Sequence, residues 1–391
     1  MRILIGHNYY QTRGGEDAVV RSECDLLKSY GHDVVLYERS NEELDTLSVW
    51  QKFRHLMSLD WSPRTHRDFK SLIKKFQPDV VHLHNIFFMI TPSVYFACRE
   101  AGIPVVQTQH NFRLMCSNAL FYRDNMVCED CLKKSLWQGV YHRCYRNSFF
   151  LTASLVNMLR KHWKKRTWID LIDVHIALSE FSRQKFIQAG IPEAKIVVKP
   201  NFTQQSVLPR SQNQGYALYI GRLSVEKGVK ILLEAWQSIK HIPLKIIGEG
   251  PLAAEFKAYA QLHNLSNVEF LGHCSPEKCQ EYMKAAKFLV VPSQCYENFP
   301  RVIAEAFSCG VPVVASRLGS LAEIIEDGTT GILFDPKQAA SLIEKIHWAV
   351  EHSEDLMRMG LHAHRVFEER YTAEQNYHQL MKIYQKAIES S

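Results

Sequence analysis

Short apolar runs alternate with amphipathic helical patterns along this chain, and the alternation restricts its fold more than any other feature. In the first half the runs are Arg2–Gly6, Val34–Tyr37, Val80–Leu83, Pro104–Gln107, Val174–Leu178 and Ile196–Val198. Several are apolar at consecutive positions, which is typical of strands buried on both faces of a parallel sheet. Helical patterns such as Asp17–Tyr30 and Ser93–Ala101 lie between them. The sequence therefore predicts an α/β, doubly wound architecture.

The alternation stops near residue 200 and then starts again. Residues 202–214 are polar and rich in turn formers. The later runs are Ala217–Ile220, Leu244–Ile247, Val268–Leu271, Phe288–Val291, Pro312–Ala315 and Ile332–Phe334. Helical patterns then continue to the end, over Ala339–Val350, Asp355–Glu369 and Ala373–Glu389. In a chain of 391 residues, we expect two Rossmann-like domains, over 1–200 and 201–372, and a terminal helix within 373–391.

The composition is that of a soluble globular protein. With 46% hydrophobic and 23% charged residues, the chain is neither collagen-like nor intrinsically disordered. No run approaches the ~20 apolar residues of a membrane-spanning helix, and the first apolar run is too short for a signal-peptide core. The ten cysteines have no framework spacing. We expect a cytoplasmic protein with mostly reduced thiols.

The two halves of the chain differ in charge. Residues 1–200 contain 28 Lys and Arg against 20 Asp and Glu, whereas the rest contains 19 against 21. A basic half favours an anionic partner such as a phosphorylated lipid, a membrane surface or nucleic acid, although an excess of this size also suits simple solvation. Nucleic acid is not expected, because no known binding motif accompanies the charge.

Glycine-rich turns follow two of the expected strands. Gly14 and Gly15 come after the first strand and open a helix, and Gly250 lies in the GEGP turn after Leu244–Ile247. Glycines let a backbone approach a ligand, and free amides at a helix N-terminus suit phosphate. A tight turn without a ligand explains either pattern equally well.

Two cations lie in the loop after the first strand of the second half, GRLSVEKG, at Arg222 and Lys227. Open α/β sheets bind ligands at the carboxyl ends of their strands. There the two side chains could clamp a pyrophosphate, Arg with paired hydrogen bonds and Lys as a point charge. A solvated loop is the competing interpretation.

The segment ENFPRVIAE places two carboxylates eight positions apart, Glu297 before an expected helix and Glu305 inside it. Asn298 or Phe299 is expected to cap that helix, with Pro300 in its first turn. Carboxylates suit the paired hydroxyls of a ribose or a sugar, and helix amides suit phosphate. Spacing alone favours a simple cap and a surface residue.

Taken in order, GGE, GRL…EKG, GEGP and the E-x7-E of YENFPRVIAEA resemble the family-4 retaining glycosyltransferases of GT-B fold, glycosyltransferase group 1. The resemblance runs from residue 1 to about 380. It implies two Rossmann-like domains facing across a cleft, with an acceptor domain over 1–200 and a donor domain over 201–372. It also implies that the terminal helix returns to the first domain.

The resemblance assigns roles to individual residues. Gly15 would contact the donor near its diphosphate, which Arg222 and Lys227 would hold while stabilising the departing charge. Glu305 would bind the ribose. The remaining expected contacts are those of Glu297, Asn298 and Phe299 with the donor sugar, of Gly250 with the donor, and of Gly272 and His273 with the base.

His110 matches the family's sugar-contacting histidine, and with Glu297, Arg222 and Lys227 it completes the implied catalytic set. Apart from the resemblance, the sequence favours interpreting His110 as a core histidine at a strand end. Pro300 departs from the pattern, because many members have a glycine there and proline lacks an amide donor. That puts one phosphate or sugar contact in doubt.

The implied reaction moves a sugar from a UDP- or GDP-linked donor to a glycan or lipid-linked acceptor, with retention and without a catalytic metal or other cofactor. The pathway implied is bacterial surface polysaccharide or glycolipid synthesis. Two rivals stay open: a same-fold nucleotide-sugar epimerase or phosphorylase, and a non-enzymatic, zinc-bearing scaffold on a membrane.

Four cysteines lie in the strand-poor segment 112–147, at Cys116, Cys128, Cys131 and Cys144. Their C-x11-C-x2-C-x12-C spacing is compatible with a structural zinc site of four thiolates. Unligated cysteines or a labile disulfide are the alternatives. The other six, Cys24, Cys98, Cys274, Cys279, Cys295 and Cys309, are expected to be buried apolar residues.

Residues 159–168, LRKHWKKRTW, contain five Lys and Arg, two tryptophans and no acid. With Phe149 and Phe150 just before it, this segment is a candidate interfacial helix for the anionic inner face of the plasma membrane. A solvated basic helix explains the composition equally well.

Overall fold

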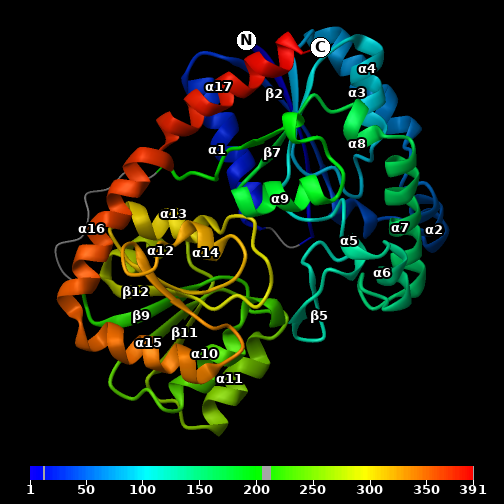
Figure 1. Ribbon diagram of the computed structural model, residues 1–391. Helices are drawn as coiled ribbons and strands as arrows, with labels where there is room; N and C mark the ends of the chain where they lie inside the picture. Colours follow the sequence, from blue (N-terminus) through cyan, green and yellow to red (C-terminus); the bar gives the residue numbers. More distant parts are fainter. Residues whose placement is uncertain (12–13, 205–212, 391) are drawn as a thin grey trace. The chain divides into compact units, whose positions relative to one another are not determined.

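The computed structural model describes residues 1–11, 14–204 and 213–390. Residues 12–13 of the first glycine turn and 205–212 of the expected linker therefore lie outside the described part. The chain forms two compact units (Figure 1). Unit 1 comprises residues 1–121, 128–200 and 376–391, and unit 2 comprises residues 122–127 and 201–375.

Unit 1 is built on a six-stranded parallel sheet of order β2-β1-β3-β4-β7-β8. Its strands are β1 (Arg2–Tyr9), β2 (Asp33–Ser40), β3 (Val80–Leu83), β4 (Val105–Thr108), β7 (Val174–Ala177) and β8 (Ile196–Val198). Every strand predicted in this half is present. The strand β1 is longer than expected because His7 and Asn8, although polar, are fully buried and hydrogen-bonded.

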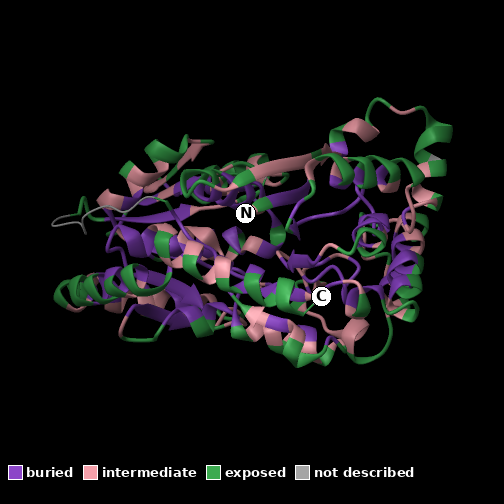
Figure 2. Cartoon of the chain, turned by 90° about the horizontal axis from the view of Figure 1, so that it is seen from above, coloured by how far each residue is buried: buried purple, intermediate pink, exposed green. Residues whose placement is uncertain are grey.

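The helices of unit 1 fill the connections between these strands. They are α1 (Gly15–Ser29), α2 (Val49–Met57), α3 (Pro63–Phe76), α4 (Ser93–Ala101), α5 (Asp130–Lys133), α6 (Trp137–Tyr141), α7 (Phe149–Lys164), α8 (Thr167–Asp170) and α9 (Glu180–Gln188). As Figure 2 shows, buried residues concentrate on the strands and exposed residues on the outer sides of the helices.

Unit 2 carries the second six-stranded parallel sheet, of order β11-β10-β9-β12-β13-β14. The strands are β9 (Tyr216–Ile220), β10 (Leu244–Ile247), β11 (Val268–Gly272), β12 (Ala286–Val291), β13 (Val313–Ser316) and β14 (Gly331–Phe334). Its helices are α10 (Val229–Trp236), α11 (Ala253–Leu262), α12 (Pro276–Ala285), α13 (Arg301–Ser308), α14 (Leu321–Ile324), α15 (Ala339–Glu351) and α16 (Ser353–Arg370). This strand order is that of a Rossmann fold, and all six predicted runs form strands.

The terminal helix α17 (Ala373–Glu389) crosses from unit 2 into unit 1 at residue 376. Its side chains Leu380, Ile383 and Tyr384 are buried in the core of unit 1. There they pack beside α1 on one face of the sheet, among residues such as Ile3 and Val20 (Figure 1).

The segment 112–147, in which no clear strand was expected, contains a small hairpin. The strands β5 (Tyr122–Arg123) and β6 (Met126–Val127) pair antiparallel. Their turn residues Asp124 and Asn125 both have positive φ. Asp and Asn tolerate this backbone, which a two-residue hairpin turn of type I′ requires.

Within the described residues, no helix has both the length and the apolar composition needed to cross a bilayer.

Candidate active site

In unit 2 the strand order reverses between β9 and β12, and open α/β sheets bind ligands at the carboxyl ends of such strands. The loops that leave these two strands are tied together. The backbone N–H of Gln294 donates to the backbone carbonyl of Glu226, at a distance of 2.8 Å. A Cβ on Gly228 would lie 1.8 Å from the carbonyl oxygen of Pro292, and Gly228 has φ of +73°. Glycine is therefore required where the two loops meet.

Lys227 and Glu297 form an ion pair where these loops meet. The Nζ of Lys227 donates to Oε1 of Glu297 at 2.6 Å, and the hydroxyl of Ser293 donates to the same oxygen at 2.7 Å. Ser320 donates to the backbone carbonyl of Glu297 at 2.6 Å. The carboxylate is thus held from its side chain and from its backbone.

The pair fixes the charge state of both groups. Burial raises the pKa of Glu297, but the Lys227 ammonium, the Ser293 hydroxyl and Arg222 outweigh it and hold that pKa below its ordinary value. Burial lowers the pKa of Lys227, but the Glu297 carboxylate outweighs it and raises that pKa above its ordinary value. At neutral pH the site therefore contains a fixed ammonium and a fixed carboxylate.

Arg222 is the second cation of this site. Its guanidinium lies 3.1 Å from Oε1 of Glu226, and its side chain is 48% exposed. Ser224 donates to the same oxygen of Glu226 at 2.6 Å. Glu226 was not among the predicted site residues. Its position between Arg222 and Lys227 in the sequence is the feature that could have indicated it.

The loop after β12 differs in detail from the expectation. The N-cap of α13 is Pro300, with Arg301 as first helical residue, so neither Asn298 nor Phe299 caps the helix as predicted. The chain stays extended at Pro300 because the Phe299 ring is buried against Tyr371 and its carbonyl accepts from Asn201. Phe299 can therefore offer a ligand only its backbone amide.

Glu305 lies in the second turn of α13 and accepts from Arg301 at 2.8 Å. Both side chains are partly exposed, at 30% and 23%. No described contact joins Glu305 to the Lys227–Glu297 pair. The structure thus brings Lys227 and Glu297 into contact, with Arg222 near enough to affect the pKa of Glu297, and leaves Glu305 separate from them.

The turn after β10 has a clear packing role. A Cβ on Gly250 would lie 2.4 Å from the carbonyl oxygen of Leu223, and one on Gly248 would lie 2.0 Å from that of Gly221. These glycines let the turn press against the arginine-bearing loop. Pro251 lies before the N-cap of α11, which starts at Ala253. Gly272 ends the next strand, and His273 after it is exposed.

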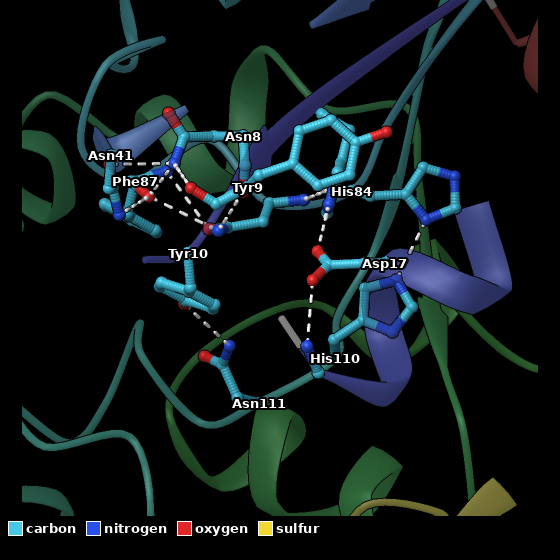
Figure 3. A network of polar contacts seen from close by, with 12 residues as sticks. Asn8, Tyr9, Tyr10, Asp17, Asn41, His84, Phe87, His110 and Asn111 are labelled. Carbon is cyan, nitrogen blue, oxygen red and sulfur yellow. Dashed lines mark hydrogen bonds and ion pairs between the residues drawn. The ribbon is translucent and has the colours of Figure 1, made fainter. Parts of the chain in front are cut away.

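In unit 1 the strand order reverses between β1 and β3. The buried asparagines Asn8, Asn41 and Asn85 organise the loops there, and Figure 3 shows the first two. Asn8 donates to Asn41 and to the carbonyl of Phe87. Asn85 donates to the carbonyl of Asn8 at 2.7 Å, and Met89 donates its amide to Oδ1 of Asn8 at 3.0 Å. These bonds fix the loop that follows β3.

Helix α1 begins beside this loop. Asp17 accepts from the amide of Gly14 at 2.8 Å and contacts Nε2 of His7, also at 2.8 Å. A Cβ on Gly15 would meet no atom within 4 Å among the described residues. Packing therefore does not require a glycine at this position.

His110 follows β4 and lies beside a histidine from β3. Its Nε2 is 2.9 Å from Nδ1 of His84, and the two rings are nearly parallel (Figure 3). Burial, followed by the charges of neighbouring groups, lowers the pKa of both rings well below the ordinary value, so both are neutral at physiological pH. The two histidines line a pocket together with Asn85, Gln107, Gln109 and Arg113.

A buried ion pair lies behind these histidines. Lys199 donates to Oε1 of Glu23 at 2.6 Å, and both side chains are almost fully buried. His82, next to them, contacts the hydroxyls of Thr108 and Tyr384, each at 2.8 Å. Glu23, Lys199 and His82 were not predicted as site residues from the sequence. The alternating histidines at 82 and 84 were the only local signal.

Two groups of potential metal ligands occur in the described part of the chain. One contains Glu23, His82 and His84, and the other His7, Glu16 and Asp17; the ligand atoms of each lie within 4.8 Å of one another. In the first group Lys199 occupies one carboxylate oxygen and hydroxyls occupy both nitrogens of His82. A buried polar network accounts for that group without a metal ion.

Neither group contains a cysteine. The thiols of Cys116, Cys128, Cys131 and Cys144 are unoxidised and all belong to unit 1. Burial raises the pKa of Cys131 to about 12, and the Cys116 and Cys144 thiols contribute in the same direction. Of the six cysteines expected to be buried, Cys274 and Cys279 are only partly so, because they lie in and just before the exposed helix α12.

The two tryptophans of the basic segment 159–168 are engaged by the fold. Trp168 is fully buried, and the indole of Trp163 donates to the carbonyl of Leu114 at 2.8 Å. Both tryptophans thus belong to the fold. Several exposed apolar side chains lie on helices α2, α6 and α7, and they are Val49, Trp50, Met57, Trp137, Tyr141, Phe149 and Phe150. Helix α7 packs against both α2 and α6.

Two family models match the chain in succession. Glycosyltransferase Family 4 covers residues 13–204, and Glycosyl transferases group 1 covers residues 201–366. An uncharacterized glycosyltransferase of Methanocaldococcus jannaschii is 30% identical over 389 residues, which are 99% of this chain and 98% of that protein. O-antigen chain mannosyltransferase C of Escherichia coli is 29% identical over 45% of this chain and 47% of its own length.

Solved structures of similar fold include sucrose-phosphate synthase from Thermosynechococcus elongatus, with a TM-score of 0.73, 19% identity and all of both chains covered. Another is HepE from Anabaena in complex with UDP and glucose, with a TM-score of 0.68, 19% identity and 98% of each chain covered. Likeness at this level of identity establishes the fold. The two parallel six-stranded sheets are those of the GT-B fold. The chain belongs to the family-4, group 1 glycosyltransferases.

Proposed function

We propose that this glycosyltransferase moves a sugar from a nucleotide-diphosphate sugar to a glycan or lipid-linked acceptor, with retention of anomeric configuration. The observation that carries the proposal is the Lys227–Glu297 pair, with Arg222 near it, at the carboxyl ends of the strands where the order of the second sheet reverses. The donor diphosphate binds Lys227 and Arg222, and the ribose binds Glu305.

The physical argument is electrostatic. Breaking the bond between a sugar and a diphosphate leaves negative charge on the diphosphate. Cations that are already in place stabilise this charge without reorganising, and a partly dehydrated site makes their effect larger. Glu297 keeps Lys227 protonated and in position. Two such cations supply the stabilisation that a metal ion gives elsewhere, so we propose chemistry without a catalytic metal.

Retention follows from attack on the face that the diphosphate leaves. The acceptor oxygen bonds to the anomeric carbon, the sugar–phosphate bond breaks, and the departing diphosphate takes the acceptor's proton. This route needs no enzyme nucleophile. Glu297, which the Lys227 ammonium and the Ser293 hydroxyl already engage, is suited to orienting a sugar hydroxyl.

The relatives support the substrate classes. The HepE structure contains UDP and glucose, which favours a nucleotide-sugar donor, UDP- or GDP-linked. The similarity to an O-antigen chain mannosyltransferase favours a growing surface glycan as acceptor. On the protein side, His110 and the neighbouring Asn85 and Gln109 give the pocket of unit 1 several groups that can bind sugar hydroxyls.

The test is the thermal stability of the purified protein with UDP, GDP, ADP and their common sugar conjugates, without added metal. A ligand at ~100 times its dissociation constant raises the free energy of unfolding by about 2.7 kcal/mol. The proposal expects stabilisation by one nucleotide and loss of that response in Lys227→Ala. A response to no nucleotide in a folded protein would instead favour a scaffold.

Product analysis separates the remaining alternatives. Incubation with the nucleotide sugar that stabilises the protein and with candidate acceptors should yield a glycoside whose anomeric proton shows the donor's configuration by NMR. An epimerase would return an altered nucleotide sugar with no acceptor present. A phosphorylase would cleave a glycosidic bond of a glycan with inorganic phosphate and release a sugar phosphate, without any nucleotide.

For membrane contact we propose the exposed side chains of α2 and α7 in place of the predicted tryptophans. Trp50 is 81% exposed and Phe150 is 75% exposed. Exposed lysines near the end of α7, such as Lys164 and Lys165, suit anionic lipid headgroups.

Phe149→Ser/Phe150→Ser should reduce co-sedimentation with anionic vesicles but not with neutral ones. Leu262→Ser, which also removes an exposed apolar side chain, is the matched control. Equal binding by all three proteins would contradict the proposal.

For Cys116, Cys128, Cys131 and Cys144 we propose a structural zinc ion. The proximity of the Cys116 and Cys144 thiols, which help to raise the pKa of Cys131, supports it, as does the two-residue spacing between Cys128 and Cys131. The purified protein should contain about one zinc per chain by elemental analysis, and a chelator should lower its melting temperature. Cys131→Ser should lose the metal, whereas the control Cys98→Ser should keep it. A metal-free wild-type protein that refolds fully would exclude the site.

A further inference from the structure

Glu23, His84 and His110 form a line from the core of unit 1 to its pocket. Oε2 of Glu23 lies 3.5 Å from Nε2 of His84, and Nδ1 of His84 lies 2.9 Å from Nε2 of His110. Both histidines line the pocket, but Glu23 and His84 are almost completely buried, whereas His110 is partly exposed. Only the last member of the line can meet a substrate.

The first contact of this line joins two atoms that have no other partner. Among the described residues, neither Oε2 of Glu23 nor Nε2 of His84 makes a hydrogen bond, and at 3.5 Å the two atoms form an ion-pair contact with each other. The other oxygen of Glu23 is held by Lys199 at 2.6 Å. Buried polar atoms are almost always paired, so these two atoms are expected to satisfy each other.

This contact decides which nitrogen of His84 carries the proton. Both rings are neutral, because burial lowers the pKa of each well below its ordinary value. A neutral imidazole has one N–H and one lone pair. If Nδ1 of His84 carried the hydrogen, the lone pair of Nε2 would face a buried carboxylate oxygen. The hydrogen therefore belongs on Nε2, where it points toward Glu23.

The choice at His84 propagates to His110. With its hydrogen on Nε2, His84 has a lone pair on Nδ1 and can only accept at that atom. His110 must then donate from Nε2, since the two nitrogens are 2.9 Å apart. That leaves Nδ1 of His110 as the one acceptor nitrogen of its ring.

We infer that Glu23, acting through His84, is a positioning residue that fixes His110 as its Nε2–H tautomer, so that Nδ1 accepts a hydrogen bond from a substrate hydroxyl. The hydroxyl is that of a sugar, and this part rests on the proposed function. The tautomer itself depends only on the contacts in unit 1. The two can therefore fail separately.

The test is ¹⁵N NMR of the histidine side chains in the full-length protein, with the signals of His110 assigned by their loss in His110→Gln. Protonated and unprotonated ring nitrogens have well-separated shifts. The inference expects a protonated Nε2 and an unprotonated Nδ1 in the wild-type protein. A protonated Nδ1 would overturn it, and this measurement requires no variant of Glu23.

Glu23→Gln gives a second, sharper result. Lys199 can only donate, so it selects the amide oxygen of Gln and turns the NH₂ group toward His84. Nε2 of His84 must then accept, which moves the hydrogens of both His84 and His110 to Nδ1. A purely structural role for Glu23 predicts no such exchange. Glu43→Gln, which removes a carboxylate paired with Arg39 in the same unit, should leave the histidine signals unchanged.

Turnover completes the test. Glu23→Gln should lower kcat/KM for the acceptor roughly tenfold, about the effect of one lost hydrogen bond. Glu23→Asp, which restores a carboxylate, should recover both the tautomer and part of the activity. An exchanged tautomer with unchanged kcat/KM would refute the role in binding. A wild-type Nε2–H tautomer in a protein that binds no nucleotide sugar would refute only the proposed function.

Discussion

Lys227 and Glu297 lie 70 positions apart in the sequence, yet their charged atoms are 2.6 Å apart. The pair forms because β9 and β12 are neighbours in the sheet although two strands separate them along the chain. Gly228 lets the loops that leave these strands approach closely. The topology of the sheet thus brings the two side chains together.

The first prediction concerns the pH dependence of this pair. Glu297 has a lowered pKa in the folded protein, so its contribution to stability is present above its unfolded pKa and is lost as the pH falls through the folded value. Lys227 has a raised pKa, so its contribution is present below its unfolded pKa and is lost as the pH rises through the folded value. At neutral pH both contributions are complete.

The measurement is thermal unfolding between about pH 3 and pH 8 for wild type, Lys227→Met, Glu297→Gln and the double variant. Each single variant should lose about 1–3 kcal/mol at neutral pH, the range for hydrogen bonds to charged groups. The loss should shrink at the acid end. Glu344→Gln, at an exposed adjacent pair, should have almost no effect. Additive losses in the double variant would mean that the pair is not coupled.

Glu305 is the residue that should separate nucleotide binding from stability. It lies on the surface of α13, where its contact with Arg301 spans one helical turn and contributes little. Glu305→Gln should therefore leave the melting temperature within experimental error. It should weaken nucleotide binding roughly tenfold or more, because a carboxylate accepts the ribose hydroxyls more strongly than an amide. Isothermal titration with the nucleotide that stabilises the wild type measures this, and unchanged affinity would remove Glu305 from the site.

The strands of both sheets were predictable because short apolar runs alternate with helical patterns and several of the runs are apolar over consecutive residues, as is typical of a doubly covered parallel strand. The sequence also placed Arg222, Lys227 and Glu297 in loops that follow expected strands. Those strands, β9 and β12, are neighbours in the sheet. What local sequence could not show is which distant residues pair. Glu23 and Lys199 are 176 positions apart, and only the folded unit brings them together.

Other expectations were not met, because composition does not specify the face on which a side chain lies. The tryptophans at 163 and 168 suggested membrane contact, but Trp168 is fully buried and the indole of Trp163 donates to the carbonyl of Leu114. The cap of α13 was misplaced because the buried ring of Phe299 keeps the chain extended for longer than the proline signal suggested. Both errors concern the face on which a side chain lies, and tertiary packing decides that.

The terminal helix provides a prediction about the core of unit 1. Leu380 is fully buried against the sheet, whereas Ile388 in the same helix is 36% exposed. Leu380→Ala should cost about 2–5 kcal/mol through lost burial and the cavity left behind. Ile388→Ala should cost less than about 1 kcal/mol. Urea unfolding of the full chain, with hydrogen exchange to locate the change, should show faster exchange in β1 and α1 for the first variant only. Equal behaviour would mean that α17 is not part of that core.

The two glycine turns should respond in opposite ways to the same substitution. At Gly250 a methyl group would lie 2.4–2.7 Å from three backbone atoms of Leu223, so Gly250→Ala should destabilise unit 2 by about 1–3 kcal/mol. At Gly15, the first residue of α1, a methyl group would meet no described atom within 4 Å, and alanine is a better helix former. Gly15→Ala should therefore keep or raise the melting temperature. If the donor approaches this backbone, the same variant should lose transferase activity while remaining fully folded. Full activity in Gly15→Ala would show that the turn serves only to start the helix.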